Sequence, residues 1–281
     1  MNWSDAVTKV FWYGSITLVT ALCVRLFIGR FALRFPWFTA FVAALAAESL
    51  VLALIRPYSA FVYGEVWSVT RGLALTFEAL AVIEIFSLWS RNFPGIETFG
   101  RKLFLGLLIA AAIFAAATLP ADATRGGWVF AYQMTAVANR EVHLLLATFL
   151  ALMTGFFARF GGLVDPNLRR HTRLMLWFEA ATGVCYLPDT VAREFWLSSM
   201  LVPAVSFVCL SGWLFAFRRG EDTRPDTDVS PEKMAEYEAA EALSQKLLRL
   251  RDRIKLRKLL GLKEKVRRPR PVVPPTLPGR S

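Results

Sequence analysis

The chain has 281 residues, of which 55% are hydrophobic and 20% charged, and 33 Lys and Arg against 22 Asp and Glu give a net charge of +11. The 23 Phe and 9 Trp exclude a disordered chain, and a total of three Cys excludes a disulfide scaffold. Long apolar runs followed by a charged C-terminal segment indicate an all-α membrane protein that crosses the bilayer several times.

Seven apolar segments have the length of a membrane-spanning helix, for which about 20 mostly apolar residues are needed. The first segment lacks a basic leader and a small-residue cleavage site, so we expect a retained helix rather than a signal peptide. Pro36 is predicted to begin the second segment, Pro120 to end the fourth, and Pro166 to lie in a turn before the sixth. The seven predicted transmembrane helices, which form a domain over residues 1–217, are 10–29, 37–55, 67–89, 103–119, 141–160, 174–192 and 197–217.

The basic residues predict the orientation of this seven-helix bundle. Residues 1–217 contain 16 Lys and Arg, and seven crossings would place six of them on one side and ten on the other. The richer side also receives the basic C-terminal tail. Because Lys and Arg are enriched in cytoplasmic loops, we expect the N-terminus outside and the C-terminus in the cytoplasm, in a plasma (inner) membrane.

The C-terminal tail divides into three predicted parts: a polar linker over 218–230, a basic amphipathic helix over 231–268 and a Pro-rich disordered end over 269–281. We expect the helix to lie on the bilayer or on the bundle, and its apolar seam leaves self-association as the alternative. Its cations would contact anionic lipid headgroups. A nucleic-acid partner is disfavoured, because the basic stretch is tethered to the membrane and has no aromatic residues to stack on bases. The predicted lipid-binding residues are Arg249, Arg251, Arg253, Lys255, Arg257 and Lys258.

Ionisable residues inside the predicted spans are candidates for function, because charge at membrane depth is costly. Glu48 lies about eleven residues into the second predicted helix, and Glu78 lies about as far into the third from the opposite side, so both fall near the midplane. Arg71 precedes Glu78 by seven residues and therefore shares its helical face.

Three more residues complete the predicted ligand- or proton-binding set. Glu84 on the third helix has a depth similar to that of Glu179 on the sixth, and His143 lies at the outer end of the fifth. We therefore expect a polar interior built by the second, third, fifth and sixth helices. Two carboxylates sharing a dry site favour proton binding or cation coordination. The alternative is that these side chains only hydrogen-bond neighbouring helices and hold the bundle together.

The sequence offers little for catalysis, so we expect a non-enzymatic protein without a cofactor, a metal site or catalytic residues. The two histidines, His143 and His171, are predicted on opposite sides, which disfavours a haem held by two histidines. No H-E-x-x-H motif occurs, and the seventh helix has no Lys for a retinal. Asp189 is the one Asp within a predicted span, which disfavours a paired-Asp protease.

Three functions fit this architecture. The leading hypothesis is a receptor-like or sensory membrane module that signals through its cytoplasmic helical tail. A small-solute or proton-coupled transporter that uses the midplane carboxylates is the second. An accessory subunit that binds another membrane protein is the third.

Overall fold

The computed structural model describes residues 3–55, 59–91, 94–122, 128–158, 166–188, 195–217, 235, 238–239, 241–250 and 252. Within these residues every regular element is helical, as the sequence predicts. Seven long helices and the short α2 precede the tail. Their bounds are α1 Trp3–Ile28, α2 Phe31–Arg34, α3 Pro36–Ile55, α4 Ala60–Ser90, α5 Pro94–Asp122, α6 Trp128–Phe157, α7 Pro166–Cys185 and α8 Phe195–Ala216.

Local sequence signals begin several of these helices. Pro36, Pro94 and Pro166 each occupy the first helical position, where the fixed φ of proline suits a helix and the missing N–H costs nothing. Ser59 caps α4, because its side chain accepts a hydrogen bond of 3.3 Å from the Val62 N–H.

Several predicted boundaries differ from the structure. The third, fourth and fifth predicted spans, 67–89, 103–119 and 141–160, belong to helices that begin earlier, at Ala60, Pro94 and Trp128. The sixth predicted span, 174–192, is α7 in the structure and runs from Pro166 to Cys185. The first turns of α7 are basic, so an apolar run does not mark where the helix begins. Pro166 occupies the first helical position and does not lie in a preceding turn. Helix α5 likewise continues through Pro120 to Asp122.

Among the residues that the structure describes, five helices are long and apolar enough to cross a membrane, by length and composition. Helices α5 and α7 are not among these five, which differs from the predicted seven spans. The five stretches are Lys9–Ile28, Pro36–Ile55, Phe61–Ser90, Met134–Phe157 and Leu197–Ala216.

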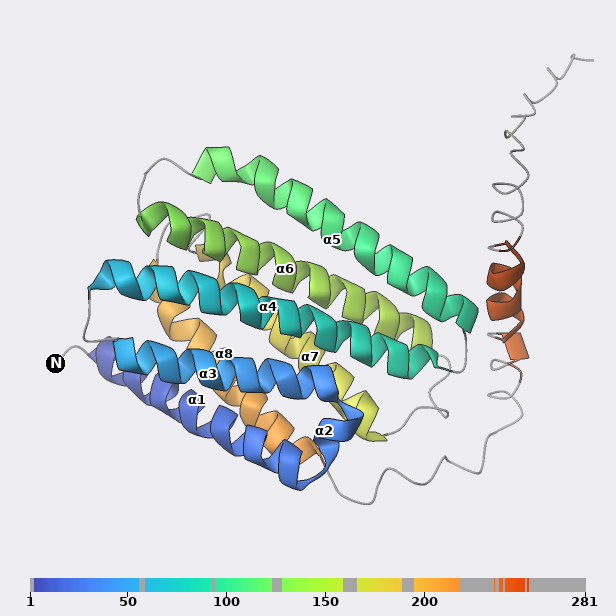
Figure 1. Ribbon diagram of the computed structural model, residues 1–281, viewed down its shortest axis with the longest axis horizontal. Coiled ribbons are helices and arrows are strands. Elements are labelled where there is room, and N and C mark those ends of the chain that lie inside the picture. The colour runs from blue at the N-terminus through green and yellow to red at the C-terminus, as the bar shows by residue number, and fades with distance from the viewer. Residues whose placement is uncertain are drawn as a thin grey trace, which may run out of the picture.

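Six of the long helices close a ring. Helix α1 packs on α3, which packs on α4; the ring continues through α6, α7 and α8 and returns to α1. Helix α5 lies outside this ring, against α6 and α4 (Figure 1). Long helices that follow one another in the chain run in opposite directions (Figure 1). The ring leaves one shared interior, to which side chains from distant parts of the sequence contribute.

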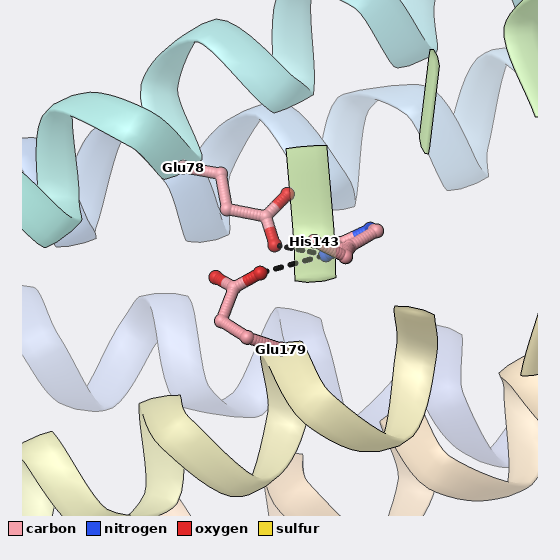
Figure 2. Close-up of side chains that lie close together, drawn as sticks. All are labelled: Glu78, His143 and Glu179. Atoms are coloured by element: carbon pink, nitrogen blue, oxygen red, sulfur yellow. Dashed lines mark hydrogen bonds and ion pairs between the residues drawn. The ribbon is translucent and has the colours of Figure 1, made fainter. Parts of the chain in front are cut away.

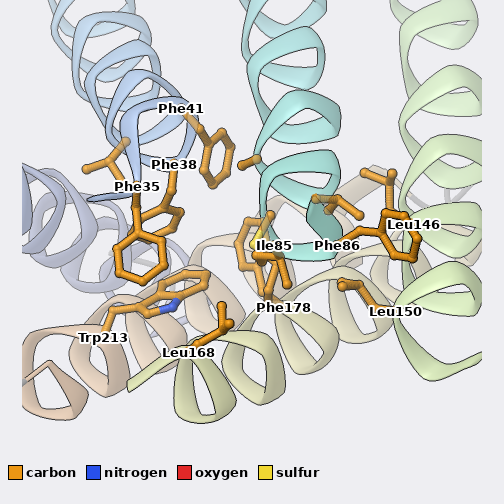
Figure 3. Close-up of a cluster of buried hydrophobic side chains, with 14 of the residues drawn as sticks. Phe35, Phe38, Phe41, Ile85, Phe86, Leu146, Leu150, Leu168, Phe178 and Trp213 are labelled. Carbon is orange, nitrogen blue, oxygen red and sulfur yellow. The ribbon is translucent and has the colours of Figure 1, made fainter. Parts of the chain in front are cut away.

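An aromatic core fills the ring near the start of α3 and the end of α8. Phe38, Phe178 and Trp213 lie together there and are almost completely buried (Figure 3). The Trp213 Nε1–H donates a 3.0 Å hydrogen bond to Nδ1 of His171, whose ring contacts Phe38 edge-on. This half of the bundle is therefore a packed apolar core around one histidine.

The described part of the tail includes a helical segment, 241–250, that lies at the end of the bundle where α5 begins (Figure 1). Ser244 is 2% exposed, and its Oγ accepts a 3.0 Å hydrogen bond from the Gly95 N–H. Leu247 packs against the hydrophobic core. The tail segment is thus fastened to the bundle by a polar contact and an apolar one.

Most of the predicted tail features lie outside the described residues. Of the six predicted lipid-binding residues, Arg249 is described and exposed. The other five, the linker 218–230 and the end 269–281 are not described; the five are Arg251, Arg253, Lys255, Arg257 and Lys258.

The contact at Gly95 leads to a first prediction. A Cβ at this position would meet the backbone of Ser244, which cannot rotate away, so Gly95→Ala should release the tail segment. We expect the protection of amides 241–250 from hydrogen exchange to fall roughly tenfold or more, which corresponds to about 1.4 kcal/mol. Gly106→Ala is the matched control on α5, because a Cβ there meets nothing within 4 Å. Equal protection in the two variants would contradict the docking.

Candidate functional site

A polar cluster lies in the interior of the helix ring, and four helices contribute to it. Arg71 is 6% exposed, Glu48 is 8% exposed, and the remaining members are completely buried. We call this set the core cluster. It consists of Glu48 on α3, Arg71 and Glu78 on α4, Asn139 and His143 on α6, and Glu179 on α7.

Helical spacing places these residues on the inward faces. Arg71 and Glu78 are seven residues apart and Asn139 and His143 are four apart, so each pair shares one face of its helix. Glu179 lies on a face of α7 that buries polar residues, whereas Trp177 two residues earlier is 70% exposed. The amphipathic pattern of α7 therefore points its polar side into the ring.

Arg71 connects three helices through its guanidinium group. Its Nε donates a 2.7 Å hydrogen bond to Asn139 Oδ1, and its Nη2 lies 2.9 Å from Nε2 of His143. Two carboxylates lie slightly farther away, with Nη1 3.8 Å from Glu48 Oε2 and Nη2 3.9 Å from Glu78 Oε2. The guanidinium thus neutralises part of the buried negative charge, and its short contacts go to neutral partners on α6.

The contacts of His143 determine which ring nitrogen carries the proton. An arginine has only donors, so Nε2 must accept from Arg71 Nη2 and Nδ1 must carry the hydrogen. Nδ1 lies 2.7 Å from Glu179 Oε2 and 3.1 Å from Glu78 Oε1 (Figure 2). Its single hydrogen reaches Glu179 in the shorter contact. His143 is therefore a neutral relay between the guanidinium and the two carboxyl groups.

The carboxyl groups of Glu78 and Glu179 point toward each other, and the His143 ring lies beside both (Figure 2). Both Glu78 oxygens and Oε1 of Glu179 have no hydrogen-bond partner among the described residues. Both side chains are completely buried, so ionising both carboxyl groups there would cost a large desolvation free energy. A proton held between the two groups would remove one charge and supply the missing hydrogen-bond donor, so this geometry suits a shared proton.

The same atoms satisfy the distance requirement for a metal site. One ligand atom each from Glu78, His143 and Glu179 lie within 4.8 Å of one another. A metal on Nδ1 would force the ring hydrogen onto Nε2, where it would point at the Arg71 donor. The position of Arg71 therefore favours a proton over a metal ion.

A cavity of about 320 Å³ lies next to the core cluster. Glu48 and Arg71 supply its charged groups among the described residues, and the rest of its polar lining comes mainly from serines and aromatic side chains. These residues come from α1, α3, α8 and the first half of α4, and from the chain just after α7. The serines are Ser15, Ser49, Ser198, Ser199 and Ser206, and the aromatic residues are Trp12, Tyr63, Trp67 and Tyr186.

The structure brings together five of the six residues selected from the sequence and separates the sixth. Glu84 lies elsewhere, where its Oε1 accepts from the Trp37 N–H and its Oε2 from the Phe38 N–H, each at 3.1 Å. These are free backbone donors in the first turn of α3, so Glu84 is a helix cap supplied by a neighbouring helix.

Sequence reasoning missed Asn139, which forms the shortest hydrogen bond to Arg71. Asn139 precedes His143 by four residues, and this spacing places both on the same face of a helix, which could have identified it. It also missed the serines of the cavity, since serine is common in helices of every environment and only the packing of α8 against α1 brings them together.

No protein-family profile, curated protein or solved structure matches this chain. The interpretation of the core cluster therefore depends on its geometry.

A second prediction concerns the role of Arg71. Arg71→Met leaves three buried carboxyl groups without their cation, and removing one partner of a buried ion pair costs about 3–5 kcal/mol. Arg71→Met combined with Glu78→Gln should recover part of that loss, because one excess carboxylate is removed. Unfolding in detergent measures both variants, and Arg91→Met at the exposed end of α4 is the control, with an expected change below about 0.5 kcal/mol. Strictly additive losses in the double variant would contradict this charge balance.

A third prediction separates Glu84 from the cluster. Glu84→Ala leaves two backbone donors of α3 unpaired and should lower the free energy of unfolding by about 2 kcal/mol. Glu84→Gln keeps one acceptor oxygen and should lose less. Glu65→Ala, on the exposed face of α4, is the control. A loss for Glu84→Ala no larger than that for Glu65→Ala, measured by thermal unfolding, would show that the cap contributes nothing.

Proposed function

We propose that this chain is a multi-pass protein of the plasma (inner) membrane, in which all seven long helices cross the bilayer. Five of them have the required apolar length among the described residues. Helix α5 has 29 residues with an apolar stretch over 103–119, and α7 can follow because its polar side faces the ring. Alternating helix directions then require the two ends of the bundle to lie on opposite sides of the membrane.

The distribution of charge supports a cytoplasmic tail and an N-terminus outside. Basic residues gather at the helix ends that lie beside the tail segment, as expected for a cytoplasmic surface. The described members of this basic end are Arg25, Arg30, Arg34, Arg91, Arg101, Lys102, Arg169, Arg170 and Arg173. The basic part of the tail would face anionic lipid headgroups on the same side.

Within this frame we assign the chain a receptor-like, sensory role. The observation that carries this proposal is the arrangement of the cavity and the tail at opposite ends of α4. Trp67 and Arg71, in its first half, line the cavity, while its last turn leads into α5, whose Gly95 holds the tail segment. A solute in the cavity would contact the end of α4 that is distant from the tail.

The core cluster gives such a solute a means of shifting the bundle. Arg71 lines the cavity and also bonds α6, so a solute that changes its position changes the contacts of α4 with α6 and, through His143, with α7. A ligand shifts a conformational equilibrium only as far as its affinities for the two states differ. The difference in affinity between the two states would arise from direct contact of the solute with the Arg71–Glu48 pair.

The core cluster also favours a second candidate, a proton-coupled transporter. Three buried carboxyl groups with one guanidinium form a site that can take up and release a proton. In that function the cavity would deliver a solute across the bundle rather than signal to the tail.

The sensory proposal predicts that filling the cavity alters the tail. Ser206→Phe places a ring in the cavity wall, and it should change hydrogen exchange of amides 241–250 by at least about threefold, which corresponds to about 0.65 kcal/mol of altered opening. Val208→Phe is the control on α8, because Val208 is 66% exposed on the outside of the bundle.

Two results would contradict the sensory proposal. One is unchanged exchange of the tail segment in Ser206→Phe. The other is flux of a labelled solute into proteoliposomes that is lost in the same variant, which would favour the transporter.

A further inference from the structure

The cavity beside the core cluster has a composition that indicates the charge of its ligand. Its volume of about 320 Å³ is near the lower end of the range for small-molecule sites, about 300–1,000 Å³. The site therefore suits a small solute. Which solute it selects depends on the groups in its wall.

The charge of the surrounding protein is negative. The tautomer argued above makes His143 neutral, so the charge of Arg71 is set against three carboxyl groups: Glu48 and Glu78, which it contacts, and Glu179, which it reaches through His143. A proton shared by Glu78 and Glu179 still leaves two carboxylates against one guanidinium. Arg140, the next cation along α6, is paired with Glu141 at 2.7 Å and adds little positive charge. One positive charge on a ligand in the cavity would neutralise the remaining carboxylate.

Glu48 is the carboxyl group that a ligand can reach, because it lines the cavity while Glu78 and Glu179 are completely buried. Its Oε2 faces Arg71 across 3.8 Å, which is longer than a hydrogen bond. That oxygen has no hydrogen-bond partner among the described residues. Oε2 itself is buried, so what the geometry shows is a pair that is not closed by a hydrogen bond, with the Glu48 carboxyl group at the cavity wall keeping acceptor capacity for a donor of a ligand.

The remaining walls also suit a cation. Four aromatic side chains line the cavity, and the face of an aromatic ring attracts a positive charge. The serine hydroxyls can accept hydrogen bonds from an ammonium group. A pocket for an anion would instead need a cation without a carboxylate beside it; the Nε and Nη2 groups of Arg71 bind Asn139 and His143, and its Nη1 lies 3.8 Å from the Glu48 carboxyl group.

From these observations we propose that the cavity binds a small organic amine in its ammonium form, with Glu48 as the counter-ion and the aromatic residues as its walls. This inference rests on the proposed ligand-binding role of the cavity and adds the chemical class of the ligand. The ammonium group contacts the Glu48 carboxylate, and the organic part of the amine packs between the rings.

Three probes of one size and different charge test this assignment. Benzylamine, benzyl alcohol and benzoate share a ring and differ in the group that would face Glu48. Binding is measured by isothermal titration calorimetry on the full chain in nanodiscs of phosphatidylcholine, with empty nanodiscs as the blank. Benzylamine should bind about tenfold or more tightly than benzyl alcohol, and benzoate should bind most weakly.

Variants then locate the binding site. Glu48→Gln should remove the preference for benzylamine over benzyl alcohol, whereas Glu65→Gln, exposed on α4 and outside the cavity wall, should keep it. Ser206→Phe should abolish binding of both and carries the test if Glu48→Gln does not fold. Equal affinities of amine and alcohol, tighter binding of benzoate, or an amine preference that survives Glu48→Gln or Ser206→Phe would overturn the assignment.

The outcome also separates this inference from the sensory proposal. If benzylamine binds without any change in hydrogen exchange of amides 241–250, the ligand class stands and the sensory role fails. If Ser206→Phe alters the tail but benzylamine does not bind, the sensory role stands and the ligand class fails.

Discussion

The interior of the helix ring depends on one guanidinium group among buried carboxyl groups. Arg71 cannot lose its charge, and ions in an apolar interior are stable only when partners replace water. Its bonds to Asn139 and His143, and its longer contacts with Glu48 and Glu78, draw α3, α4 and α6 toward one point. The relative position of these helices therefore depends on the Arg71 guanidinium, because no other site in the described part of the interior offers its charge the same partners.

This constraint also relates the two ends of the bundle. On one side of Arg71 lies the cavity, and on the other lies the aromatic core around Trp213 and His171. Helix α4 contacts both, since Trp67 lines the cavity and the Trp89 Nε1–H donates to Thr172 on α7. A tightly packed core transmits a shift of one helix to its neighbours rather than absorbing it. The tail segment at Gly95 is close to the end of that path.

The sequence predicts the helical class and the inward side of the helices well, because apolar length and helical spacing are local properties. Glu48, Arg71, Glu78, His143 and Glu179 could be selected from depth and spacing alone. Glu84 could not be separated from them, since its role as a cap depends on the distance between the start of α3 and the C-terminal part of α4. The start of α7 was missed because its first turns are basic, although Pro166 was visible.

The tautomers of the two histidines test the central claim, that Arg71 and a neutral His143 hold the buried acids together. The contacts require opposite tautomers: His143 carries its hydrogen on Nδ1, whereas His171, whose Nδ1 accepts from Trp213, carries it on Nε2. Nitrogen-15 NMR of histidine-labelled protein distinguishes these forms, and His171→Phe assigns the signals. We expect a neutral ring for His143 with its hydrogen on Nδ1. An imidazolium, or a hydrogen on Nε2 of His143, would contradict the account.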